Sequence, residues 1–190
     1  IFRDEVPENV LKNADIIDGE DKWLLPGVID THVHFREPGL TEKGDFESES
    51  KAAVAGGVTS IMDMPNTLPQ TTSMAEIDKK IALAEKKCLT NFSFYIGATN
   101  DNIDEVINVD KNKVCGIKVF IGSSTGNMKV DNPEVLDKIF KDAPILVATH
   151  NEDEKMIEEN LKKIKEELGD QPIPITYHEL IRNSDACYKA

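Results

Sequence analysis

The chain has 190 residues and carries 35 acidic against 22 basic side chains, so its formal net charge is −13 at pH 7. This excess of negative charge argues against nucleic acid or an anionic membrane surface as partner, and no apolar run approaches the length of a membrane span. The three cysteines are odd in number and widely spaced, which favours reduced thiols over a disulfide framework. With no export signal in the first residues, we expect a cytoplasmic protein.

Residues 1–25 form an extended, partly polar preamble to the rest of the chain. A short apolar run at 14–17, a turn at 18–21 and a second apolar run at 23–25 predict a hairpin. A segment of this size is too small to be a domain alone.

From residue 26 onward, apolar runs alternate with helical patterns, which favours parallel βα units. The expected strands cover 27–34, 58–64, 91–97, 116–121 and 145–149. The expected helices cover about 47–55, then begin near 74 and 133, cover about 152–168, and begin again near 183. Successive strands start about 30 residues apart, so eight units would need about 240 residues, close to the length of a TIM (β/α)8 barrel. The sequence therefore predicts an α/β fold in which residues 26–190 supply about the first five βα units of such a barrel, cut at both ends.

The first predicted strand ends in a pair of histidines. Side chains alternate along an extended chain, so His32 and His34 project to the same side, with Arg36 next in line where the strand ends. Two imidazoles about 7 Å apart can bind one cation, and a guanidinium beyond them suits a carboxylate held near that cation. The pattern proposes a metal hydrolase, although two solvated histidines on a strand face would give the same spacing.

Lys118 lies inside the apolar fourth strand. A charged lysine is costly there, so its pKa should fall, and a neutral amine can take up carbon dioxide to form a carbamate whose two oxygens could bridge two cations. In the alternative interpretation the side chain extends out of the barrel or pairs with an acid. The carboxyl ends of barrel strands share the rim that carries the active site, and His150 ends the fifth strand on that rim.

Residues 24–39, which read LLPGVIDTHVHFREPG, resemble the first barrel strand of dihydroorotases in the amidohydrolase superfamily almost letter for letter. Segments 58–67 and 116–127 continue the resemblance, which spans essentially the whole chain. It implies a metal-dependent hydrolase with two zinc ions, bridged by a carboxylated lysine. The residues that match the family's metal ligands are His32, His34, Lys118 and His150, and those that match its substrate-binding positions are Arg36 and Asn66.

Some dihydroorotases use an aspartate as the bridge a few residues further on, but residues 122–128 contain no acid, which favours Lys118. The family's catalytic aspartate ends strand eight, and another ligand histidine ends strand six. Both would lie beyond Ala190, so we expect the catalytic residue outside this segment and no activity from the segment alone. The resemblance assigns residues 1–25 to a small N-terminal β subdomain, part of a β-sandwich. His178 and Arg182 resemble a stretch between strands five and six of the family, and we favour a structural role that holds this crossover over a role as ligands.

The activity that the resemblance implies is the reversible, zinc-dependent conversion between L-dihydroorotate and N-carbamoyl-L-aspartate in de novo pyrimidine biosynthesis. Other cyclic amidohydrolases, namely hydantoinase, dihydropyrimidinase or allantoinase, are alternatives, and Arg36 favours a substrate with a free carboxylate. A non-catalytic dihydroorotase-like subunit that scaffolds aspartate transcarbamoylase is a third interpretation, but such relatives usually lose metal ligands. The expected partner is a small-molecule substrate, with no nucleic acid and no membrane, and a homodimer is compatible with the resemblance.

Overall fold

The computed structural model describes residues 5–122 and 127–190, which form an α/β fold around a five-stranded sheet. The sheet has the order β1-β2-β3-β4-β5, and every neighbouring pair is parallel. The strands are β1 (Val28–Val33), β2 (Val58–Asp63), β3 (Asn91–Gly97), β4 (Gly116–Phe120) and β5 (Val147–His150). The helices are α1 (Glu8–Leu11), α2 (Phe46–Ala55), α3 (Met74–Lys87), α4 (Ile103–Ile107), α5 (Pro133–Asp142), α6 (Glu154–Leu168), the 3-10 turn η1 (Ile175–Tyr177), α7 (His178–Ile181) and α8 (Ser184–Lys189).

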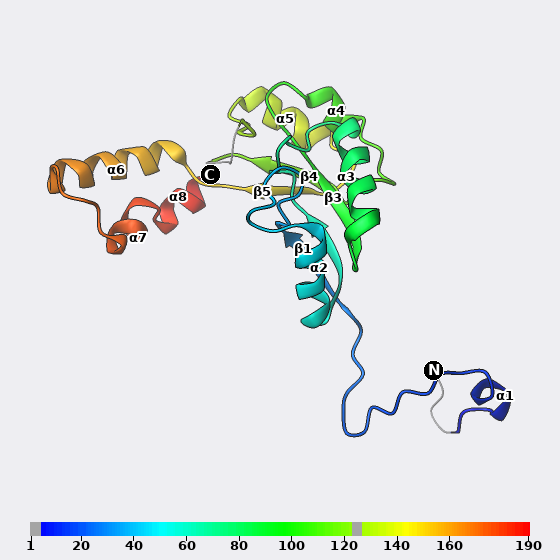
Figure 1. Cartoon of the computed structure of the whole chain (residues 1–190). Helices are drawn as coiled ribbons and strands as arrows, with labels where there is room; N and C mark the ends of the chain where they lie inside the picture. Colours follow the sequence, from blue (N-terminus) through cyan, green and yellow to red (C-terminus); the bar gives the residue numbers. More distant parts are fainter. Residues whose placement is uncertain (1–4, 123–126) are drawn as a thin grey trace.

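Because the strands lie in chain order, each helical connection returns the chain to the next position of a curled sheet, and the result is a half-barrel with α2 to α5 along one side (Figure 1). The five predicted strands and their parallel arrangement are confirmed. Strand β5 begins at Val147, later than the predicted start at 145, and continues to His150. The five-residue helix α4 was not predicted.

The core lies between the sheet and these helices. Phe46 of α2 packs between Phe35 and Phe94, with ring centroids 6.3 and 5.8 Å away, and all three rings are buried. This aromatic cluster connects α2 with the end of β1 and with β3. It therefore fixes the chain where β1 ends and the predicted site begins.

Strand β4 shows which of its side chains face the helices. Ile117 and Val119 are fully buried members of the core cluster. Side chains alternate along a strand, so Lys118 and Phe120 project to the opposite face of the sheet, on the inner side of the half-barrel. The alternative in which Lys118 extends outward toward the helices is therefore wrong.

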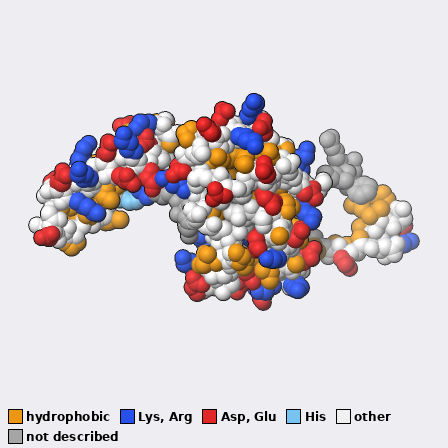
Figure 2. Space-filling view, turned by 90° about the horizontal axis from the view of Figure 1, so that it is seen from above, with side chains coloured by type: hydrophobic (Ala, Val, Ile, Leu, Met, Phe, Trp, Pro, Cys, Tyr) orange, Lys and Arg blue, Asp and Glu red, His pale blue; other side chains and the backbone are white. Residues whose placement is uncertain are grey.

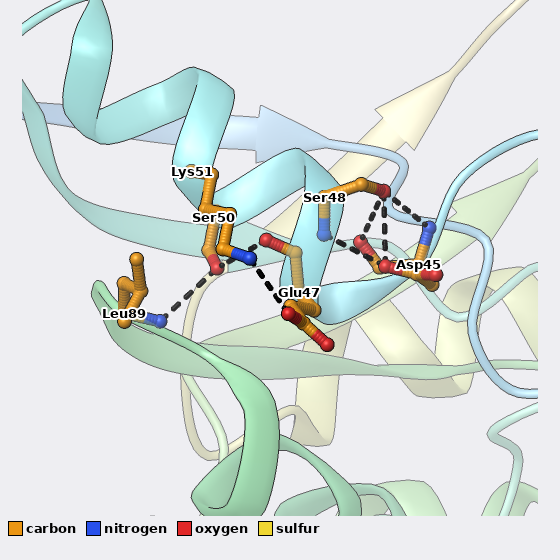
Figure 3. Close-up of polar contacts among 6 residues, drawn as sticks. All are labelled: Asp45, Glu47, Ser48, Ser50, Lys51 and Leu89. Carbon is orange, nitrogen blue, oxygen red and sulfur yellow. Dashed lines mark hydrogen bonds and ion pairs between the residues drawn. The ribbon is translucent and has the colours of Figure 1, made fainter.

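Helix α2 is held at its N-terminus and in its first turns (Figure 3). The Asp45 carboxylate accepts a hydrogen bond from the Ser48 N–H at 2.7 Å, and Ser48 Oγ accepts one from the Asp45 N–H at 3.4 Å, which makes a reciprocal cap. The buried Ser50 hydroxyl accepts a hydrogen bond from the Leu89 N–H at 3.0 Å. The last contact ties α2 to the turn between α3 and β3.

The hairpin expected within residues 14–25 is not present. Residues 12–27 contain no strand, and the only regular structure before β1 in the described part of the chain is the short helix α1. This arm runs away from the sheet (Figure 1), and Trp23 and Leu24 are 88 % and 100 % exposed. An isolated hairpin is marginally stable unless further strands or a helix cover its apolar face, and none does so here. The assignment of residues 1–25 to a β subdomain stays a prediction, and residues 1–4 lie outside the described part.

Beyond β5, helices α6 to α8 project from the sheet and contact one another (Figure 1). Asn160 of α6 donates a hydrogen bond from Nδ2 to the carbonyl of Ile181 at 3.2 Å. Basic and acidic side chains are interspersed over this end of the molecule (Figure 2), as expected for a solvated face of α6. Among the helices of residues 5–122 and 127–190, none combines the length and the apolar character needed to cross a membrane.

Candidate metal centre

The two histidines of the first strand lie together at the carboxyl end of β1. Their ring centroids are 5.4 Å apart, which confirms that His32 and His34 project to the same side. The β1–β2 register shifts between Asp30 and Val33, and the His32 N–H donates to the Asp30 carboxylate at 3.1 Å across this irregularity. The irregularity lies around His32 at the end of β1, and the two histidines nevertheless share one side of the strand.

Asn66, in the loop after β2, contacts His34. The Asn66 Oδ1 lies 2.9 Å from His34 Nδ1, and the Asn66 side chain is buried. With the amide oxygen as acceptor, the ring proton sits on Nδ1 and the lone pair on Nε2 is available to a metal. The resemblance implies that Asn66 contacts the substrate. In the structure Asn66 also contacts the ring of His34, which is a candidate metal ligand.

Lys118 lies on β4, next to the edge strand β5, on the inner face of the sheet. The residue is 2 % exposed, and its Nζ lies 5.1 Å from the centroid of the Phe120 ring. Burial lowers the pKa of the Lys118 ammonium below its ordinary value of 10.5. Within the described part of the chain its ammonium has no hydrogen bond and no ion pair with a carboxylate, and its contact there is with the Phe120 ring. The expected salt-bridge alternative is therefore absent there, and an unpaired lysine with a lowered pKa fits the formation of a carbamate.

His150 ends β5 directly beside Phe120 of β4, with ring centroids 6.1 Å apart. Its Nε2 lies 3.5 Å from Glu152 Oε2, and Glu152 in turn accepts a hydrogen bond from Arg182 Nε at 2.9 Å. The Arg182 guanidinium lowers the pKa of the Glu152 carboxyl. Arg182 thus has the structural role that the sequence predicted.

Charged groups on other strands act on the pKa of His32. Burial lowers the pKa of His32 most, and the positive charges of Lys118 on β4 and His150 on β5 lower it further. The nearby Asp30 acts in the opposite direction. Because all neighbouring strands are parallel, the carboxyl ends of β1, β4 and β5, the strands of His32, Lys118 and His150, lie at the same edge of the half-barrel.

These side chains do not yet form a closed coordination shell. Within residues 5–122 and 127–190, no group of three or more His, Cys, Asp or Glu side chains is close enough to hold a metal ion. The donor chemistry nevertheless fits zinc, because the set offers imidazole nitrogens and a lysine that can become an anionic bridge. Residues 123–126 of the loop that lacks an acidic residue lie outside the described part.

Arg36 follows the histidine pair in an unusual backbone conformation. Its φ is +68°, a region that residues other than glycine seldom adopt and that often marks functional sites. The guanidinium is half-buried and has no hydrogen bond or ion pair with any described residue. Burial lowers the pKa of His34 most, and the positive charge of Arg36 is the second largest cause. Arg36 is therefore available to an anion that approaches the rim.

Two carboxylates to which the sequence pattern assigned no role hold this segment. Asp63, at the end of β2, is fully buried and forms an ion pair with Lys80 of α3 at 2.6 Å. Glu37 is also buried and pairs with Lys87 of the same helix. A signal was present, because Lys80 falls on the apolar stripe of α3 between Ile77 and Ala84, where a lysine needs a buried partner.

A five-stranded parallel half-barrel covered by helices has the architecture of part of an α/β barrel. The model of the amidohydrolase family matches residues 23–178, and the chain belongs to this family.

Three similar proteins illustrate the relationship. A dihydroorotase of Methanosarcina acetivorans is 37% identical over 176 residues, which cover 90% of this chain and 36% of that protein. A dihydroorotase of Methanothermobacter thermautotrophicus is 36% identical over 155 residues, which cover 80% of this chain and 35% of that protein. The solved structure of an L-hydantoinase from Arthrobacter aurescens superposes with a TM-score of 0.79 at 28% identity, over 87% of this chain and 37% of that one. The chain thus spans roughly a third of the length of these relatives.

His34 should make the stability of the metal-free protein depend on pH. Burial and the Arg36 charge lower the pKa of folded His34 below its ordinary value of 6.5. As the pH falls through 6.5, the unfolded chain binds a proton that the folded chain does not, so the free energy of unfolding should decrease. Urea unfolding of metal-free protein at about pH 7.5 and about pH 5.5 measures this change. A His34→Gln variant that loses as much stability over this interval as the parent protein would contradict the prediction.

Proposed function

We propose that the full-length protein is a dihydroorotase that interconverts L-dihydroorotate and N-carbamoyl-L-aspartate. In the hydrolytic direction, water adds to a ring amide carbonyl, the carbon–nitrogen bond breaks and the nitrogen takes a proton. We also propose that the half-barrel is the first part of a complete (β/α)8 barrel, because the relatives are roughly three times as long as this chain.

The metal ligands in this proposal are His32, His34, Lys118 and His150, with Lys118 carboxylated so that it can bridge two zinc ions. When bound, the zinc ions would lower the pKa of water and polarise the carbonyl of the substrate. His34 is supported by Asn66 at 2.9 Å, which orients its ring. The Glu152 contact to His150 Nε2 must open for this nitrogen to bind a cation.

The observation that carries the choice of substrate is Arg36. Its guanidinium is half-buried, has no partner in the described part of the chain and follows directly after the histidine pair. A guanidinium can bind the free carboxylate of dihydroorotate with two parallel hydrogen bonds. Asn66 can donate a further hydrogen bond from its amide nitrogen while its oxygen stays on His34. Together they would place the ring amide at the rim.

A hydantoinase is the second candidate, because the L-hydantoinase structure superposes well on this chain. Hydantoin has no carboxylate, so Arg36 would have no partner in that substrate. Purified full-length protein should therefore be assayed on dihydroorotate, hydantoin and allantoin under the same conditions, with zinc content measured in parallel. We expect turnover of dihydroorotate. Turnover of hydantoin alone would overturn the proposal, and less than about one zinc per chain without turnover would indicate a non-catalytic scaffold.

A further inference from the structure

Helix α3 carries two lysines whose carboxylate partners hold the segment that bears His34 and Arg36. Lys80 and Lys87 lie about two helical turns apart and therefore on one face of α3. Lys80 pairs with Asp63 at 2.6 Å, with both side chains at most 1% exposed, and Lys87 pairs with the buried Glu37. Each pair places a negative carboxylate beside the chain that leaves β1.

Both carboxylates also accept a backbone hydrogen bond from this part of the chain. Asp63 Oδ1 accepts from the Phe35 N–H at 2.8 Å, between the two functional residues His34 and Arg36. Glu37 Oε2 accepts from the Phe46 N–H at 3.0 Å, where the loop after Arg36 enters α2. The carboxylates thus fix the backbone on both sides of Arg36.

The position of the Asp63 contact explains why the chain needs it. The last backbone hydrogen bond between β1 and the chain that leaves β2 runs from the Met64 N–H to the Val33 carbonyl at 3.0 Å. Beyond this bond the Phe35 N–H has Asp63 as its partner. Lys80 also donates to the Met64 carbonyl at 2.9 Å, just before the loop that carries Asn66. Lys80 therefore contacts the chain that leaves β2 directly, and it acts on the chain that carries His34 through Asp63.

Packing alone does not account for this arrangement. A buried ion pair loses much of its Coulomb energy to desolvation, and apolar residues of similar volume often stabilise a core as well or better. What an apolar pair cannot do is accept the Phe35 N–H beyond the end of the sheet. The charged pair thus supplies the acceptor for the Phe35 N–H where β1 ends.

We propose that Asp63 and Lys80 are positioning residues, which hold His34 and Arg36 in the geometry for metal and substrate binding, and that Glu37 and Lys87 support Arg36 from the other side. This inference rests on the proposed function for the roles of His34 and Arg36. It extends that function because two residues of α3, outside the rim, would help to fix the geometry of the site.

The test compares two uncharged replacements of the pair in the full-length protein. Asp63→Asn with Lys80→Gln keeps a hydrogen-bond acceptor for Phe35 and a donor for Met64, whereas Asp63→Leu with Lys80→Met removes both. The matched control is Asp78→Asn with Lys113→Met, which removes an exposed ion pair of 2.7 Å from the same helix. Zinc affinity is measured by competition with a chelator, together with kcat and KM for dihydroorotate and the thermal midpoint.

We expect the Leu/Met variant to lose zinc affinity about 10- to 100-fold, on the scale of other residues that support metal ligands, and the Asn/Gln variant to recover most of that loss. If the Leu/Met variant does not fold, Glu37→Leu with Lys87→Met provides a second test. Lys87 is 40% exposed at its side chain, so this change disturbs the core less. It should raise KM for dihydroorotate more than it lowers zinc affinity.

Equal zinc affinity and equal KM in all of these variants would overturn the positioning role while leaving the proposed function intact. Turnover of hydantoin but not dihydroorotate by the parent protein would overturn the proposed substrate, and the zinc affinities would then still test the positioning role. A parent protein that binds no zinc would overturn both.

Discussion

Replacing Lys118 by methionine in the full-length protein should lower kcat/KM for dihydroorotate by about a thousandfold or more, because a metal ion contributes several kcal/mol to transition-state stabilisation. Methionine retains much of the volume of the buried lysine, which is 2 % exposed, but cannot form a carbamate. Both zinc ions should bind less tightly, since the proposed bridge between them is gone. Steady-state kinetics and zinc content per chain measure the two effects.

Two further variants separate the carbamate from the lysine charge. Lys118→Arg keeps a positive charge but does not form a carbamate, so it should be as inactive as the methionine variant. Lys118→Ala leaves space on the inner face, and a short carboxylic acid such as acetate or propionate should restore part of the activity by supplying two oxygens. An arginine variant with near-parent activity, or a methionine variant that keeps its zinc, would contradict the bridging role.

Replacing Arg36 by methionine should raise KM for dihydroorotate by about 10- to 100-fold, the range expected when a charged hydrogen-bonding group is lost. The effect should fall on KM more than on kcat, because Arg36 is proposed to hold the carboxylate rather than the reacting amide. Arg36→Lys should be intermediate, since an ammonium offers a charge without the planar pair of donors.

The matching control uses the substrate rather than the protein. The carboxamide of dihydroorotate has no negative charge, so it should be a poor substrate for the parent protein and should be little affected by Arg36→Met. An equal loss on the acid and the carboxamide would show that Arg36 acts on the fold of the loop. The positive φ of Arg36 makes this control necessary, because the residue also shapes the backbone there.

The main elements of the fold could be predicted because their signals are local. Apolar runs of strand length alternate with amphipathic segments, and all five strands were located within a few residues. Helix α4 was missed because five residues are too few to show a helical period. The prediction of a hairpin at 14–25 was wrong. The local pattern fits a hairpin, but no other element in the described part of the chain covers its apolar face.

The parts of the site that depend on local strand geometry could also be predicted, whereas contacts between distant segments could not. Alternation along a strand correctly placed His32 with His34 and turned Lys118 away from the helices. The contact between His34 and Asn66 joins two loops, and nothing in either segment alone indicates its geometry. The Asp63–Lys80 pair depends on how α3 packs against β2, which the sequence pattern leaves open.

In the proposed function, side chains of β1, β4 and β5 bind the same pair of metal ions. Anomalous diffraction at the zinc edge, from crystals of the full-length protein, tests it most directly. The proposal predicts two zinc peaks, with His32 and His34 bound to one of them, continuous density for a carbamate on Lys118 between the peaks, and His150 among the ligands of the second. An unmodified Lys118 without contact to zinc, or a His150 that still faces Glu152 with zinc bound elsewhere, would contradict it.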